Sequence, residues 1–202
     1  MYQNLRTRYD YPHRNDNQST STTQCAYLQQ RINGNCDFQI MFASIDILWG
    51  QTRQLILQRT GYCQPQWGAT EVQPGLFIGN LASSFDAANL IKHDIEAIVC
   101  CVNGIRDHST LPTLYISLSD HPGESFKPYF KDIVAFSRKY KRILFHCSYG
   151  ISRSTTAALV VILNRTPSLT VPEALGLVRT KRPCVCPNTG FLSQLIDWQT
   201  DI

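Results

Sequence analysis

One of the eight cysteines in this sequence stands in a setting that suits chemistry on a phosphate group. The residues around it read His146-Cys147-Ser148-Tyr149-Gly150-Ile151-Ser152-Arg153-Ser154. The largely apolar run at 142–146 predicts a buried strand that ends at Cys147, and an apolar helix is predicted to begin at about Ser152 or Arg153. Backbone N–H groups of such a loop converge with the helix N-terminus on one point. The segment therefore predicts an anion site.

The same setting predicts that Cys147 is an activated nucleophile. The positive potential of the loop and helix end favours the thiolate, so its pKa should lie below the value of about 8.5 for a free thiol. Arg153, six residues later, can hold a phosphate with two parallel hydrogen bonds. Ser154 can hydrogen-bond the sulfur and later assist its release, and Gly150 permits a close backbone approach. Together these residues predict nucleophilic catalysis.

Hydrophobic patterning after residue 70 predicts the elements that must position this loop. Short β-rich runs predict strands at 76–78, 97–102, 114–118 and 142–146. Helical spacing and capping residues predict helices from Ser83 or Ser84 to 92, over 126–140, over 154–164, after a Thr170–Glu173 capping box, and over 189–198 after Asn188. Strands alternating with helices predict an α/β fold, with a central, mostly parallel β-sheet flanked by helices on both faces.

The string Cys-x5-Arg-Ser, preceded by His, resembles the protein tyrosine phosphatase superfamily, and its short form is similar to the dual-specificity phosphatases. Further segments look like family signatures: Leu76-Phe77-Ile78-Gly79-Asn80, Ile116-Ser117-Leu118-Ser119-Asp120, Lys181-Arg182-Pro183, Pro187-Asn188-Thr189-Gly190-Phe191 and Gln194-Leu195. The resemblance covers about residues 70 to 200, in the family's order. It implies hydrolysis of phosphotyrosine and phosphoserine or phosphothreonine through a phosphocysteine at Cys147.

The resemblance also implies roles for residues outside the loop. An Asp after a strand is usually a turn former or a cap, but Asp120 matches the position of the family's general acid. That acid protonates the leaving group and then activates water. Glu124 is a second acid candidate on the same loop. His146 is expected to orient the active-site loop by hydrogen bonding, and Asn188 to support it.

The loop positions expected to bind the substrate phosphate are Ser148, Tyr149, Gly150, Ile151 and Ser152, together with Arg153. Tyr149 stands where the family often has a small residue, and it could line the pocket, deepen it or point away. Positions 148–152 carry no Lys or Arg, which weakens a polyphosphoinositide substrate. No cofactor and no metal are expected.

Two other functions compete with a protein phosphatase. The first is a pseudophosphatase that binds phosphorylated proteins without turnover. The presence of Cys147, Arg153 and a plausible acid argues against it. The second is an RNA 5′-phosphatase. The net charge is only +4, with six Lys/Arg against four Asp/Glu before residue 70, so no basic tail favours nucleic acid as a partner.

Length and composition predict one catalytic domain, 70–202, preceded by an extension, 1–69. The first 24 residues are polar and predicted to be disordered. Apolar residues then recur at helical spacing within 38–60, which predicts an amphipathic segment that packs on the catalytic domain, forms a homodimer or docks a substrate. No signal peptide and no stretch of about 20 apolar residues is seen, which predicts an intracellular protein, cytoplasmic or nuclear.

The cysteines are expected to be reduced thiols. Cys100 and Cys101 lie at the end of a predicted central strand and are interpreted as buried small apolar residues. An alternative is that one of them forms a reversible disulfide with Cys147. Cys184 and Cys186 make only a weak case for a metal site, because two ligands are too few.

Overall fold

The computed structural model describes residues 67–105 and 110–200. The amphipathic segment predicted within 38–60, and with it the predicted homodimer contact, lies outside the described residues. So does most of the predicted extension. Within the described part of the chain, no helix is long and apolar enough to cross a membrane.

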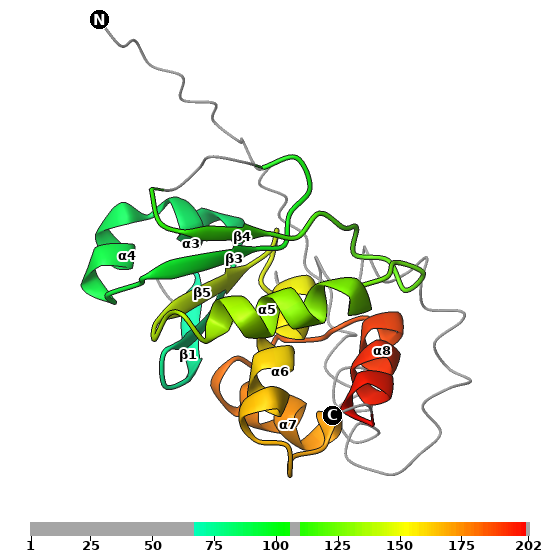
Figure 1. The fold of residues 1–202 in the computed structure, drawn as a ribbon. Helices are drawn as coiled ribbons and strands as arrows, with labels where there is room; N and C mark the ends of the chain where they lie inside the picture. Colours follow the sequence, from blue (N-terminus) through cyan, green and yellow to red (C-terminus); the bar gives the residue numbers. More distant parts are fainter. Residues whose placement is uncertain (1–66, 106–109, 201–202) are drawn as a thin grey trace, which may run out of the picture. The chain divides into compact units, whose positions relative to one another are not determined.

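The described residues contain one sheet of five strands in the order β1-β2-β5-β3-β4 (Figure 1). Its strands are β1 (Ala69–Gln73), β2 (Leu76–Gly79), β3 (Ala97–Cys100), β4 (Thr113–Tyr115) and β5 (Ile143–His146). β5 pairs in parallel with β2 and β3, and β3 pairs in parallel with β4. Only β1 runs antiparallel, beside β2. The mostly parallel sheet is therefore confirmed, and β1 is a strand that the sequence patterning missed.

Helices connect β2 to β3 and β4 to β5, and three more follow β5. They are α3 (Leu81–Phe85), α4 (Ala87–Lys92), the 3₁₀ turn η1 (Lys127–Tyr129), α5 (Phe130–Ser137), α6 (Arg153–Arg165), α7 (Val171–Lys181) and α8 (Thr189–Gln199). The predicted capping box forms, because the Thr170 side chain accepts from the backbone N–H of Glu173 while the Glu173 carboxylate accepts from Thr170. Asn188 caps α8 by accepting from the N–H of Phe191.

The central strands are buried on both faces because helices cover both. Alternate side chains of β5 face opposite ways. Ile143 and Phe145 belong to a core that includes residues of α5, α6, α7 and α8, whereas Leu144 packs in a second core with Trp67 and Leu90. Figure 1 shows α4 on one side of the sheet and α5 to α7 on the other. The predicted α/β architecture is confirmed.

Several predicted elements have different bounds in the structure. The helix predicted from Ser83 or Ser84 to 92 is two helices, because Asp86 stops α3 and accepts from the N–H of Asn89 to cap α4. The helix predicted over 126–140 is η1 followed by the shorter α5. The strands predicted over 97–102 and 114–118 end at Cys100 and Tyr115, although the predicted alternation continues, with Ile116 and Leu118 buried.

Leu144 is fully buried in the core that also holds Trp67 and Leu90, and replacing it by Ala is expected to lower the free energy of unfolding by about 2–5 kcal/mol. Leu177→Ala on α7 is the matched control, because that side chain is 47% exposed. Its cost should stay near the roughly 0.5 kcal/mol typical of surface positions. Urea unfolding of both variants measures the difference, and equal losses would contradict the arrangement of the sheet.

Candidate active site

The Cys147 loop (residues 147–152) joins the end of β5 to the start of α6. The backbone N–H of Gly150 donates to Cys147 Sγ at 3.2 Å, and Ser154 Oγ lies 3.3 Å from the same sulfur. Gly150 has φ +69°, and a Cβ there would lie 2.6 Å from the carbonyl oxygen of Gly79. The tight turn around the sulfur therefore requires a glycine.

The surroundings of Cys147 favour its charged form. Burial raises the pKa of the thiol, and the side chain is only 2% exposed. The Arg153 guanidinium, the Ser154 hydroxyl and backbone N–H groups lower it by more. The pKa of Cys147 therefore lies below its ordinary value, as the sequence predicts.

The side chain of Arg153, the first residue of α6, turns back toward the Cys147 loop. Its Nη2 donates to Ser148 Oγ at 3.0 Å, and its Nη1 donates to the carbonyl of Leu118 at 3.3 Å. Its Nε lies 3.9 Å from Asp120 Oδ2. The guanidinium is largely buried and held from three sides, so it is oriented before any ligand arrives.

Asp120 lies against the Cys147 loop rather than in solvent. Its Oδ1 accepts hydrogen bonds from Ser152 Oγ at 2.7 Å and from Asn188 Nδ2 at 2.9 Å. Ser152 Oγ in turn accepts from the backbone N–H of Asn188 at 3.1 Å. The structure thus brings together a loop after β4, the Cys147 loop and the start of α8. Because the hydroxyl of Ser152 is used in this network, its contribution to an anion site comes from the backbone.

The other predicted site residues occupy distinct places. His146 is fully buried, and its carbonyl accepts from the N–H of Cys101 at 2.9 Å. Tyr149 is 47% exposed at the surface of the loop. Ile151 is buried against Cys184, with Cys186 packed beside them. Cys184 and Cys186 therefore pack against the Cys147 loop. Among the described residues, no group of three potential ligands could hold a metal ion.

Arg182 is a supporting residue to which sequence reasoning gave no role. It is 2% exposed, and its Nε donates to the carbonyl of Gly150 at 3.0 Å. Its Nη1 donates to Thr70 Oγ1 at 3.1 Å, which links the Cys147 loop to β1. The only signal in the sequence was its place in the Lys181-Arg182-Pro183 signature, because the partner carbonyl carries no side-chain pattern.

Cys100 and Cys101 are buried thiols. Burial raises the pKa of both, and a thiolate at Cys147 raises them further, so both differ from Cys147 in favouring the neutral form. Their interpretation as small buried residues is confirmed. The disulfide with Cys147 stays a prediction.

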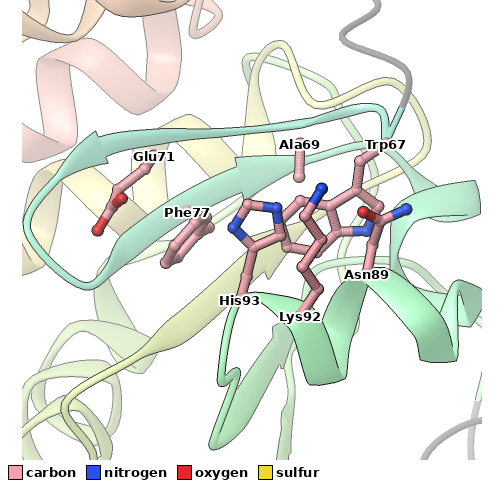
Figure 2. A pocket seen from close by; sticks show the side chains of 7 residues that line it. All are labelled: Trp67, Ala69, Glu71, Phe77, Asn89, Lys92 and His93. Atoms are coloured by element: carbon pink, nitrogen blue, oxygen red, sulfur yellow. The ribbon is translucent and has the colours of Figure 1, made fainter.

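A separate hollow of about 260 Å³ lies between α4 and the β1–β2 pair (Figure 2). Figure 2 shows the rings of Trp67 and His93 face to face, and their centroids are 4.6 Å apart. Lys92 and Glu71 also line it. None of its lining residues belongs to the Cys147 loop, so it is not part of the site described above.

The family of this chain is settled by comparison with known proteins. Residues 76–201 match the model of the dual specificity phosphatase catalytic domain. The chain belongs to the dual specificity phosphatase family. As a member, it carries the catalytic domain of a protein phosphatase, and the matched residues include the Cys147 loop, Asp120 and α8.

Relatives and solved structures agree with this membership. Dual specificity protein phosphatase 22-B of Danio rerio is 34% identical over 142 residues, which cover 66% of this chain and 75% of that protein. The crystal structure of DUSP15 has 29% identity and a TM-score of 0.62, covering 65% of this chain and 87% of that one. Human tyrosine phosphatase-like serine/threonine/tyrosine-interacting protein has 27% identity and a TM-score of 0.60, covering 66% and 96%. Among the relatives compared, the aligned region spans 34% to 75% of the relative's length.

The thiolate form of Cys147 is expected to persist to lower pH than that of a free cysteine, because the surrounding charges and donors depress its pKa. Ser154→Ala removes one donor, so it should raise the titration midpoint. Ultraviolet absorbance of the thiolate, measured against pH for the wild type minus Cys147→Ser, gives the midpoint. A midpoint at or above that of a free thiol would contradict the electrostatics of the loop.

Proposed function

We propose that this phosphatase hydrolyses phosphorylated side chains of proteins through a phosphocysteine intermediate at Cys147. The observation that carries the proposal is the combination of a cysteine with a depressed pKa, an oriented Arg153 and a carboxylate 3.9 Å from that arginine. A nucleophile, an anion holder and a proton donor are the three groups that this chemistry needs.

In the first step the Cys147 thiolate attacks phosphorus, and the bond to the leaving oxygen breaks. Arg153 and the backbone N–H groups of the loop stabilise the equatorial oxygens of the transferring phosphoryl group. A protonated Asp120 gives its proton to the leaving oxygen, which departs as a neutral phenol or alcohol. The products are phosphocysteine and an ionised Asp120.

In the second step a water molecule occupies the place that the leaving group has vacated. The Asp120 carboxylate accepts a proton from the water, whose oxygen attacks phosphorus as the sulfur–phosphorus bond breaks. The sulfur leaves as a thiolate, which the Ser154 hydroxyl stabilises by a hydrogen bond, as the 3.3 Å separation allows. Inorganic phosphate is released, and Asp120 is again protonated.

Phosphotyrosine and phosphoserine or phosphothreonine are the proposed substrates. The catalytic part of the chain is short, which favours a shallow cleft open to several phosphorylated side chains. The Cys147 loop adds no Lys or Arg before Arg153, so nothing in it favours a highly charged phosphoinositide head group. The net charge of only +4, with no basic tail, similarly argues for a protein rather than RNA as substrate.

Hydrolysis of 4-nitrophenyl phosphate and of phosphotyrosine and phosphothreonine peptides tests the proposal. Cys147→Ser is expected to reduce turnover to background, because the hydroxyl is not ionised at neutral pH. Asp120→Asn should lower kcat/KM for the peptides by roughly 10²–10⁴, the usual contribution of a general acid. Glu124→Gln on the same loop is the matched control and should keep near wild-type activity.

Each contrary result has a distinct meaning. Activity that survives Cys147→Ser contradicts the covalent mechanism. A loss with Glu124→Gln in place of Asp120→Asn moves the acid four residues along the chain. Wild-type protein that binds the phosphopeptides without releasing phosphate is the pseudophosphatase alternative, whose function is capture.

A further inference from the structure

The Gln194 side chain of α8 ties down the loop that follows Asp120. Its Oε1 accepts from the backbone N–H of Phe126 at 2.7 Å and of Lys127 at 3.0 Å. Its Nε2 donates to the carbonyl of Glu124 at 2.9 Å and to that of Gly190 at 3.1 Å. Both ends of one amide are therefore engaged, and three of these four bonds reach from α8 to residues 124–127.

These bonds supply hydrogen-bond acceptors that the residue before η1 does not provide. The first N–H groups of a helix have no partner within the helix. The residue before η1 is Phe126, whose apolar side chain makes no capping hydrogen bond. Gln194 supplies the missing acceptor from another helix. Phe126 is also fully buried and packs edge-on against Phe191, with ring centroids 5.0 Å apart, so this end of the loop is fixed by two contacts with α8.

The first turn of α8 holds the other end of the same loop. Asn188 Nδ2 donates to Asp120 Oδ1 at 2.9 Å. Gly190 lies so close to the loop that a Cβ on it would overlap the carbonyl of Pro122. The loop between Asp120 and Phe126 therefore rests directly on α8. The position of the Asp120 carboxylate relative to the Cys147 loop depends on that contact.

We propose that Gln194 is a positioning residue for Asp120 in the proton transfer to the leaving group. The inference rests on the proposed role of Asp120 as general acid. An acid must lie within hydrogen-bond reach of the oxygen it protonates, and a misplacement of about 1 Å can cost roughly 10²-fold in rate. Without the Gln194 amide, the bonds to the Glu124 carbonyl and to the N–H groups of Phe126 and Lys127 are lost. The loop then keeps its contacts with α8 at Asn188, Gly190 and Phe191, but loses the three hydrogen bonds that fix residues 124–127.

Gln194→Met, which keeps the length of the side chain and removes all four bonds, is tested with two aryl phosphates. For phenyl phosphate, a poor leaving group that needs the acid, kcat/KM should fall about tenfold or more. For 4-nitrophenyl phosphate, whose phenolate leaves without much protonation, the fall should stay below about threefold. Gln194→Glu keeps the acceptor for Phe126 and Lys127, so its loss on phenyl phosphate should be intermediate.

Gln199→Met is the matched control. Gln199 lies on the same helix, and its Nε2 donates to the carbonyl of Leu169, away from the Asp120 loop. This variant should retain the wild-type ratio between the two substrates. A general weakening of α8 would lower kcat/KM for both substrates in both variants. The ratio of the two kcat/KM values therefore separates a positioning role from a loss of stability.

Combining each change with Asp120→Asn completes the test. If Gln194 acts through Asp120, Gln194→Met adds little to the loss in an Asp120→Asn background, because residues that share one step are not additive. Equal losses on both substrates, or an undiminished effect of Gln194→Met in the Asp120→Asn background, overturn the inference. A wild-type rate for Asp120→Asn alone overturns the proposed acid instead. If Gln194→Met does not fold, Gln194→Glu is judged by the same two criteria.

Discussion

The attraction between the Cys147 thiolate and the donors around it is the interaction on which the rest of the site depends. Removing an anion from water is costly, and burial alone would keep this cysteine neutral. Arg153, Ser154 and the loop N–H groups reverse that preference and bring its pKa below the ordinary value. The backbone must therefore curl tightly around one sulfur, which is why a glycine with a positive φ stands at 150.

The tight turn of the Cys147 loop is held in place by residues from other parts of the chain. Arg182 holds the carbonyl of Gly150, so the loop cannot relax by turning that peptide away. Ser152 and Asn188 tie the end of the loop to Asp120. Because Asp120 also lies near Arg153, the carboxylate and the guanidinium share one rigid framework. The groups proposed to attack, to hold phosphate and to move protons are thus positioned before substrate binds.

The fold class and the Cys147 loop could be predicted because their signals are local. A continuous apolar run marks β5, and the spacing of Cys147 and Arg153 fixes a strand, a loop and a helix start. β1 was missed because a register shift between Glu71 and Gln73 breaks its alternation. The break between α3 and α4 was missed because an Asp such as Asp86 occurs both within helices and as an N-cap.

The support of the site was harder to foresee for a different reason. Arg182 and Gln194 act on backbone carbonyl and N–H groups far away in the sequence, and those groups are the same for almost every residue type. Asn188 was expected to support the loop, but its link to Asp120 through a side-chain amide depends on how α8 meets the sheet edge. Tertiary contacts of this kind leave no periodic pattern in the chain.

The central claim is that a bond forms between phosphorus and Cys147 during turnover. Rapid quenching of the reaction with a ³²P-labelled phosphopeptide, followed by proteolysis and mass spectrometry, tests it directly. The account predicts label on the peptide that contains Cys147, and more of it in Ser154→Ala, where the leaving thiolate has lost a hydrogen bond. Continued turnover with no label on Cys147, or with label on another residue, would contradict the account.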